Sequence, residues 1–281
     1  MSDPAGALGL IAGNGRFPFL VMDAARALGR DVVVVAVKEE AGPDLEAHAH
    51  LRGAALHWVS LGQLGRCIEV LQAGGCREAV MAGQVKHAKL FAGITPDWTF
   101  MQVLMRLRAK STDAVISAIA DVLRSKGIEL IDSTTLLQPL MAREGLLAGP
   151  ALSSDQEETL AFGYRMADAV AGLDIGQTIV VKDKAVVAVE AMEGTDETIR
   201  RAGRIAGPGC CVVKVAKPGQ DMRFDVPVVG VPTIDVLREA GVLVLSLDAG
   251  KTLIVDGQPM LDAATSAGIT VVGRVVESHG G

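Results

Sequence analysis

The chain has 281 residues, of which 49% are hydrophobic and 21% charged, and its net charge is −6. This length and composition allow one large domain or two modest ones with a substantial core. An acidic chain without a basic stripe argues against nucleic acid as a partner, so a few local cations must bind any anionic ligand. Aromatic residues make up only 3% of the chain, and such a composition favours α/β layers.

The amino terminus and the cysteines predict the compartment. The run MSDPAGALGLIAGNG has no basic segment before its short apolar stretch, so we expect no signal peptide. No apolar stretch reaches the roughly 18 residues of a membrane span. The cysteines form no Cys-x-x-Cys pair and are expected to be buried thiols in a reducing compartment. We therefore expect a cytoplasmic protein that at most touches a membrane surface.

Strand and helix patterns alternate through the first half of the chain. Strands are expected at 7–12, 31–37, 56–61, 78–82 and 128–132, and helices over a stretch ending near Leu28 and at 63–72, 98–107 and 112–126. The valine-rich run at 31–37 is typical of a strand buried on both faces. The alternation implies parallel pairing with right-handed crossovers, and so predicts a Rossmann-like sheet over residues 1–135.

The second half predicts another α/β domain. An irregular stretch at 136–152, with Pro139 and Gly149-Pro150, is interpreted as a linker to a domain at 153–281. Ser153 or Ser154 is expected to cap a long helix. Asp183-Lys184 is expected to be a hairpin turn. Further elements are expected at 178–182, 185–190, 196–205, 211–215, 233–240, 242–247, 253–256, 259–267 and 269–272. The predicted fold is α/β, with a Rossmann-like first domain and a second α/β domain.

A glycine turn, Gly13-Asn14-Gly15, separates the first strand from the first helix, where backbone N–H groups and the helix dipole favour an anion. The dinucleotide fingerprint would need a third glycine where Pro18 stands, which counts against NAD. A contact to a phosphate or nucleotide and a plain tight turn both remain open at this stage.

Two more segments follow the strand at 78–82. Gln84, Lys86 and Lys89 should lie at the carboxyl edge of the sheet, where ligands of open α/β sheets gather, although a solvated loop is an equal alternative. Residues 90–105 concentrate apolar bulk beside Arg106, Arg108 and Lys110. That pattern fits an acyl-chain groove or a membrane-surface contact, but an ordinary core helix is the commoner cause.

The segment from Glu190 to Asp196 ends one element and begins a helix. Gly194 permits close backbone approach, and Thr195 or Asp196 can cap the helix. Capping does not account for the acids that precede them, Glu190 and Glu193, which are spare carboxylates for chemistry.

The run Lys214 to Asp225 is the densest cluster of reactive side chains. Lys214 ends a strand and Pro218-Gly219 turns the chain; if the segment from Asp221 is extended, then Asp221, Arg223 and Asp225 share one face. Pyrophosphate hydrolysis needs such groups, because cations hold the phosphates and carboxylates bind a divalent metal or orient water. The alternative is a salt-bridged surface loop.

Three segments together resemble the LpxI family of UDP-2,3-diacylglucosamine pyrophosphatases of the lipid A pathway. They are Ile11–Pro18, Glu190–Asp196 and Lys214–Pro227. The resemblance implies two α/β domains enclosing the substrate, a homodimer, Mg²⁺ or another divalent cation, and contact with the inner membrane surface. It implies that water attacks the phosphate nearest uridine, releasing UMP and 2,3-diacylglucosamine 1-phosphate (lipid X), with Asp225 essential.

The candidate site residues fall into three groups. Asp225, Lys214 and Asp221 are expected to be catalytic, and Asp225, Asp221 and Glu190 to bind the metal. The expected substrate contacts are Gly13, Asn14, Gln84, Lys86, Glu190, Gly194, Thr195, Asp196, Lys217 and Arg223.

Two other kinds of protein remain as alternatives. One is another Rossmann-type enzyme, either a nucleotide-sugar transferase or an NAD(P) oxidoreductase, and Pro18 counts against the latter. The other is a non-catalytic module that binds a nucleotide lipid, and the paired acids count against it.

Overall fold

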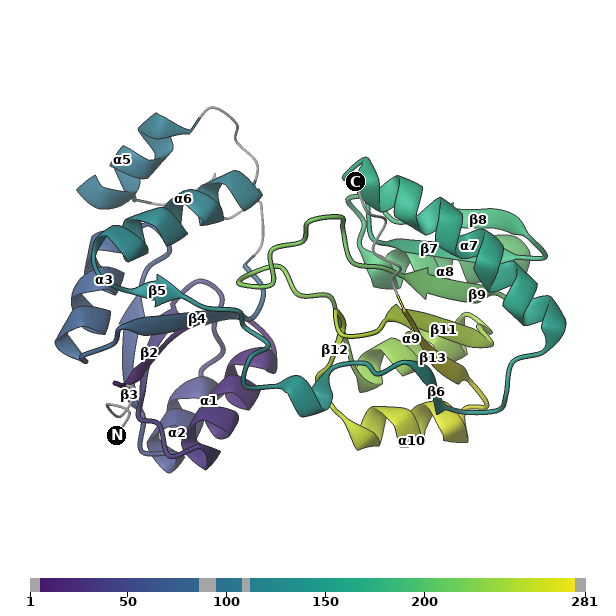
Figure 1. Ribbon diagram of the computed structural model, residues 1–281, viewed down its shortest axis with the longest axis horizontal. Helices are drawn as coiled ribbons and strands as arrows, with labels where there is room; N and C mark the ends of the chain where they lie inside the picture. Colours follow the sequence, from purple (N-terminus) through teal and green to yellow (C-terminus); the bar gives the residue numbers. More distant parts are fainter. Residues whose placement is uncertain (1–5, 86–94, 108–111, 276–281) are drawn as a thin grey trace. The chain divides into compact units, whose positions relative to one another are not determined.

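A computed structural model describes residues 6–85, 95–107 and 112–275 (Figure 1). The chain divides into two compact units. The N-terminal unit is Met1–Leu137 with Met222–Phe224, and the C-terminal unit is Gln138–Asp221 with Asp225–Gly281. Each unit contains its own sheet, and the α/β fold class expected from the sequence is confirmed.

The N-terminal unit is built on a parallel sheet with strand order β3-β2-β1-β4-β5. Its strands are β1 (Leu8–Ala12), β2 (Val32–Val37), β3 (Ala55–Val59), β4 (Glu78–Ala82) and β5 (Glu129–Leu130). Its helices include α1 (Phe17–Ala27), α2 (Asp44–Leu51), α3 (Leu64–Ala73), α5 (Trp98–Arg106) and α6 (Thr112–Ser125). Helices α1 and α2 cover one face and α3, α5 and α6 the other, which is the Rossmann-like arrangement (Figure 1).

Burial follows the sequence pattern closely in this unit. All six residues of β2 are buried, because both faces of the sheet are covered by helices. Phe100 and Val103 of α5 belong to the core on the α3–α6 face, so residues 98–105 do form a core helix on that side. The strand order reverses beside β1, between β2 and β4, and ligands of such sheets bind at this switch point.

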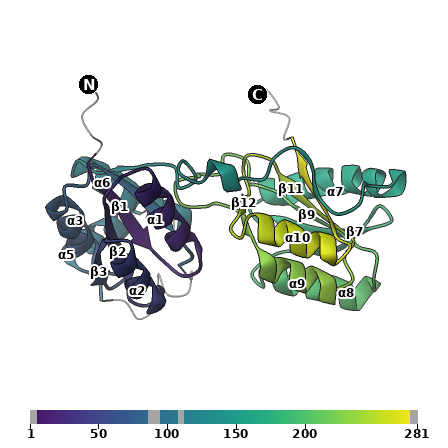
Figure 2. The same cartoon turned by 90° about the horizontal axis from the view of Figure 1, so that it is seen from below.

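The C-terminal unit contains a mixed sheet with order β6-β13-β11-β9-β7-β8. Its strands are β6 (Gly145–Ala148), β7 (Thr178–Lys182), β8 (Ala185–Val189), β9 (Cys211–Lys214), β11 (Val244–Asp248) and β13 (Thr270–Arg274). The short strands β10 (Val228–Val229) and β12 (Leu253–Ile254) pair separately. Helix α7 (Ser154–Gly172) covers one face, and α8 (Thr195–Ala206), α9 (Val231–Glu239) and α10 (Gln258–Ser266) the other (Figure 2).

Several local predictions for this unit can be checked directly. Ser153 caps α7 through a capping box with Gln156. Asp183 and Lys184 both have positive φ and join antiparallel β7 and β8, as expected of a tight hairpin turn. Strand β6, however, lies in the stretch read as irregular, and it pairs antiparallel with β13.

The segment from Asp221 to Asp225 is not extended, so the condition for Asp221, Arg223 and Asp225 to share one face is not met. Residues 222–224 form a turn, and the Asp225 N–H donates to the carbonyl oxygen of Asp221 at 3.0 Å. The two carboxylates and Arg223 therefore do not share one face of a strand. In the described part of the chain, no helix is both long and apolar enough to cross a membrane.

Candidate functional site

One edge of the C-terminal sheet collects the polar residues that the sequence singled out. Lys214 is the last residue of β9, and it is paired in register with Thr178, the first residue of antiparallel β7. Glu190 directly follows β8 at the same edge, and its N–H donates to the carbonyl oxygen of Thr178 at 2.9 Å. The reversal of β7 therefore brings the ends of β8 and β9 to one edge.

Lys214 and Glu190 are linked through a single hydroxyl. The Lys214 Nζ donates to the Thr195 Oγ1 at 2.9 Å, and that hydroxyl donates to the Glu190 Oε1 at 2.8 Å. The Thr178 Oγ1 lies 3.3 Å from the Thr195 Oγ1, and it must act as the donor because the Thr195 proton is already used. The Gln177 N–H donates to the other Glu190 carboxylate oxygen at 3.3 Å. These bonds fix Lys214, Thr195 and Glu190 as one network.

Lys214 is buried, and desolvation disfavours the charged form of a buried side chain. Its side chain is buried, with only 8% exposure, and burial lowers its pKa below the ordinary value. The carboxylates of Glu190, Asp196 and Asp225 act in the opposite direction without cancelling the effect. Three acids around one buried lysine bring Asp225 into the same electrostatic environment as the network.

Helix α8 begins at this network. Its N-cap is Gly194, which has φ of 84° and makes no side-chain cap hydrogen bond, and a Cβ placed there would meet open space. The positive φ explains the glycine. Thr195 does not cap the helix, since its hydroxyl bonds Lys214 and Glu190 instead. A helix start without a side-chain cap, beside a buried lysine, favours an anion such as phosphate.

The other predicted acid of this segment has a structural role. Glu193 accepts hydrogen bonds from Arg201 at 2.6 Å and from the Ala191 N–H at 3.2 Å. Hydrogen bonds to backbone N–H groups and to Arg201 lower the pKa of this carboxyl. Glu193 thus holds the loop between β8 and α8 in place, while Glu190 serves the network.

The loop after β9 is held at both ends by side chains that the sequence did not reveal. The buried Asp248, at the end of β11, accepts from the Ala216 N–H at 2.8 Å. Gln220 accepts from the Lys217 N–H at 2.6 Å and donates to the carbonyl oxygen of Asp225 at 2.7 Å. Asp248 and Gln220 thereby set the path of the chain that carries Asp225.

Asp248 is itself fixed by a second network. The Arg274 Nε donates to the Asp248 Oδ1 at 2.5 Å, and the Arg274 guanidinium also binds both oxygens of Asp168 on α7. The guanidinium stacks on the ring of Tyr164, with the Arg274 Cζ 4.7 Å from the ring centroid. Burial alone would lower the pKa of Arg274, but Asp168 and Asp248 raise it above the ordinary value. This arginine stays charged and anchors the end of β11.

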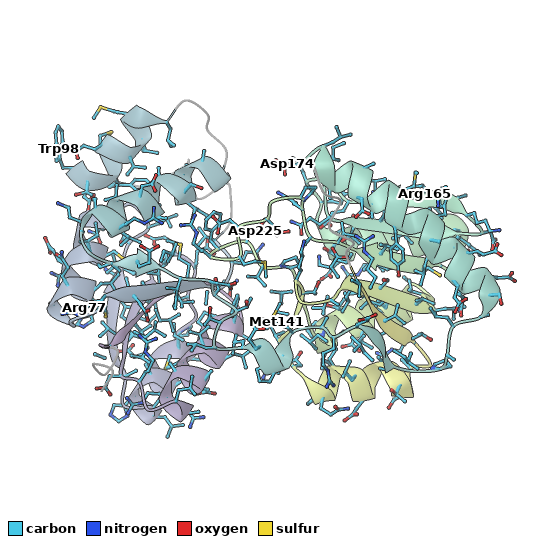
Figure 3. The ribbon with its side chains drawn as sticks, in the orientation of Figure 1. Arg77, Trp98, Met141, Arg165, Asp174 and Asp225 are labelled. Atoms are coloured by element: carbon cyan, nitrogen blue, oxygen red, sulfur yellow. The ribbon has the colours of Figure 1, made fainter. Side chains whose placement is uncertain are left out.

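The two other predicted cations of the run, Lys217 and Arg223, belong to different units. Lys217 forms an ion pair at 2.6 Å with Asp174. Asp174, labelled in Figure 3, follows the end of α7. Arg223 belongs to the N-terminal unit with Met222 and Phe224. In that unit the Ser133 hydroxyl contacts the carbonyl oxygens of Met222 and Arg223 at 3.0 and 2.7 Å. Asp221 and Asp225 stay in the C-terminal unit with Lys214.

The N-terminal unit brings two other predicted residues together at its switch point. Asn14 follows β1 and Gln84 follows β4, and their backbones exchange two hydrogen bonds of 2.9 Å. A Cβ on Gly13 would come within 2.7 Å of the Gln84 carbonyl oxygen, so the close approach requires glycine. The N–H groups of Gly13, Asn14 and Gln84 are all used by protein carbonyls. The exposed side chains of Asn14 and Gln84 are therefore what this edge offers a ligand.

The predicted substrate contact at Lys86 and the predicted metal ligands remain to be described. Lys86 lies outside the described residues. Within the described part of the chain, no three His, Cys, Asp or Glu side chains lie close enough together to hold a metal ion. Mg²⁺ commonly takes only one or two carboxylates and completes its shell with substrate phosphates and water. Asp225, Asp221 and Glu190 thus form no three-carboxylate cage, and metal binding by one or two of them with substrate oxygens stays a prediction.

Comparisons with known proteins cover nearly the whole chain. Residues 7–140 match the LpxI N-terminal domain, and residues 143–272 match the LpxI C-terminal domain. The chain is also 31% identical over 277 residues to the UDP-2,3-diacylglucosamine pyrophosphatase LpxI of Caulobacter vibrioides, covering 95% of this chain and 96% of the relative. The resemblance seen in the three sequence segments is thus confirmed, and the chain belongs to the LpxI family.

Proposed function

We propose that this chain hydrolyses the pyrophosphate of UDP-2,3-diacylglucosamine to UMP and 2,3-diacylglucosamine 1-phosphate, a step of lipid A biosynthesis. The relative from Caulobacter vibrioides carries the name of that hydrolase. The observation that carries the proposal is the buried Lys214, linked through Thr195 to Glu190 at the start of α8. A desolvated cation and helix N–H groups are the means by which a protein stabilises charge on a phosphoryl group.

The C-terminal unit supplies groups that match the phosphates of the substrate. Lys214 and the start of α8 would hold the phosphates, and Asp225, half-buried beside Lys214, would orient the attacking water or bind the cation. Asn14 and Gln84, at the switch point of the N-terminal unit, stay proposed substrate contacts of that unit. Water adds to one phosphorus, the bridging oxygen leaves with the other phosphate, and both protons of the water pass to solvent as the two phosphate monoesters ionise.

A divalent cation is part of the proposal. Asp225 is the carboxylate that would hold this cation, and the bound cation would supply charge neutralisation at the phosphates. Glu190 is already engaged by Thr195 and by the Gln177 N–H, which favours a positioning role for it. Asp221 lies in the same unit as Asp225, and its carbonyl accepts the Asp225 N–H.

The test is UMP release from the purified chain with and without Mg²⁺. Asp225→Asn should reduce turnover to near the background rate, while Asp235→Asn, which changes an exposed carboxylate on α9, should leave it unchanged. Wild-type turnover that survives in the Asp225→Asn variant would remove that carboxylate from the mechanism. Binding of the substrate without UMP release, with any divalent metal, would establish a binding module instead.

A separate isotope-labelling experiment identifies the phosphorus atom that water attacks. Hydrolysis in ¹⁸O-labelled water places the label in UMP if water attacks the phosphate nearest uridine, as the family resemblance implies. Label in the sugar 1-phosphate would show attack on the other phosphorus. Mass spectrometry of both products distinguishes the two directly.

A further inference from the structure

Asp174, just beyond the end of helix α7, is an unusual residue for its position (Figure 3). Its backbone has φ of 56°, in the left-handed region where glycine or asparagine commonly follows a helix. Its N–H donates to the carbonyl oxygen of Ala171 at 3.0 Å, so a carboxylate stands at the negative end of the helix dipole. Both local effects disfavour aspartate, and the reason for a carboxylate here therefore lies outside the helix turn.

The Asp174 carboxylate forms an ion pair with Lys217, in the loop after β9, at 2.6 Å. The Asp174 side chain is 70% exposed, and an ion pair so open to solvent adds little to stability. The stability of the fold therefore gives no reason for this pair. Its position on the loop that leads to Asp225 suggests a role in the reaction.

A continuous chain of contacts runs from Asp174 through Lys217 to Asp225. The Lys217 N–H donates to the side-chain oxygen of Gln220 at 2.6 Å, and the Gln220 N–H donates to the Lys217 carbonyl oxygen at 3.1 Å. The side-chain amide of Gln220 then donates to the carbonyl oxygen of Asp225 at 2.7 Å. A displacement of Lys217 is therefore passed on to the backbone of Asp225.

Helix α7 holds the start of the same loop at a second point. Asp168 on α7 binds the Arg274 guanidinium, and Arg274 donates to Asp248 at 2.5 Å. The other carboxylate oxygen of Asp248 accepts from the Ala216 N–H at 2.8 Å. The path of the loop is thus set from α7 at two places, and the one at Asp174 is nearer in sequence to the catalytic carboxylate.

We propose that Asp174 is a positioning residue for the hydrolysis, which acts through Lys217 and Gln220 to hold Asp225 in its reactive orientation. This rests on the proposed function, in which Asp225 orients the attacking water or binds the cation. A small displacement of a catalytic group lowers the rate of the chemical step steeply. Because Asp174 acts on the orientation of Asp225, its loss should lower kcat and leave KM nearly unchanged.

The test is kcat and KM for UMP release by Asp174→Asn, with urea unfolding of the same preparation. Asparagine tolerates the left-handed conformation and brings no charge to the helix end, so the urea midpoint should be at or above the wild-type value. The kcat should fall roughly tenfold, with KM within about twofold of wild type. Asp183→Asn is the matched control, because Asp183 also has positive φ, 49°, and follows β7 in the hairpin; it should keep both constants.

The route through Lys217 is tested by a double-variant cycle. Lys217→Met should itself lower kcat, and adding Asp174→Asn to that variant should change kcat by less than about twofold. If the two substitutions instead lower kcat independently, Asp174 does not act through Lys217 and the proposal fails. Wild-type kcat in the single Asp174→Asn variant would overturn it as well.

Hydrogen–deuterium exchange measures the order of the loop without any turnover. The peptide covering residues 215–226 should exchange faster in Asp174→Asn than in the wild type or in Asp183→Asn. Unchanged exchange in this peptide would contradict the proposal. A wild type that releases no UMP would refute the proposed reaction, and the exchange rates would then still show whether Asp174 orders the loop.

Discussion

Replacing Lys214 with methionine should leave the chain folded but nearly inactive. Methionine fills a similar apolar volume but lacks the ammonium that donates to Thr195 at 2.9 Å. Two effects on folding oppose each other. Loss of a charged hydrogen bond costs about 1.5–3 kcal/mol, whereas the charge whose pKa burial lowers no longer has to be desolvated. We expect the free energy of unfolding to change by less than about 2 kcal/mol.

The effect on turnover should be larger than the effect on folding. Removing one preorganised group that stabilises developing charge typically lowers kcat about 100- to 1,000-fold, or about 2.7–4 kcal/mol. The assay is UMP release under saturating substrate, with urea unfolding of the same preparation. Lys182→Met is the control, because Lys182 donates to the carbonyl oxygens of Ala206 and Pro208 at 2.8 Å, at the opposite end of β7. That variant should lose stability and keep its kcat.

The lowered pKa of Lys214 also predicts how the stability of the folded chain depends on pH. The folded chain binds the Lys214 proton less tightly than the unfolded chain, in which the pKa is near 10.5. Unfolding therefore takes up protons, and stability rises with pH from the folded-state pKa toward 10.5. Relative to Lys214→Met, the wild type should gain free energy of unfolding over that window. A constant or falling difference, or turnover within about threefold of wild type in the folded variant, would refute the reasoning.

Three further outcomes are expected. Thr195→Val should lower kcat roughly tenfold, since the hydroxyl that joins Lys214 to Glu190 is lost, and Thr195→Ser should restore it; equal activity of the two would remove the hydroxyl from the site. Asp248→Asn should reduce the free energy of unfolding by about 3 kcal/mol, because its buried ion pair with Arg274 is broken; an unchanged urea midpoint would contradict this. Burial raises the pKa of Cys67 to about 12 and of Cys211 to about 11, so iodoacetamide should modify these thiols only after unfolding, as mass spectrometry would show.

Periodicity and turn chemistry predicted most elements of the fold. The buried valines of β2, the capping box at Ser153 and the turn at Asp183-Lys184 are all local signals, and each was readable from a few neighbouring residues. Helix α2 was not predicted, because only Leu45 and Ala49 of its eight residues are buried and the apolar pattern is short. Strand β6 was missed because it pairs antiparallel with the distant β13.

The candidate site was predictable only at residues that a local sequence pattern marks. The sequence singled out Lys214, Glu190 and Thr195 because polar groups follow apolar strands, and the structure joins these three side chains by hydrogen bonds. Capping was enough to explain Thr195 from the sequence, and only the tertiary structure brings its hydroxyl to the Lys214 ammonium. Asp248 and Gln220 escaped notice, because they act by holding backbone groups of a loop, and no composition or spacing marks such a role.

The network of Lys214, Thr195 and Glu190 in the C-terminal unit depends on one antiparallel strand. Since β7 runs against β9, the hairpin returns β8 parallel to β9 with β7 between them, and Glu190 and Lys214 then flank Thr178. Along β9, Cys211 and Val213 pack on the α7 face, so the alternation directs Lys214 to the α8 face. A register shift of one residue would turn the lysine toward α7 and away from Thr195. The buried cation is thus positioned by strand order and register, with Thr195 and the start of α8 completing the site.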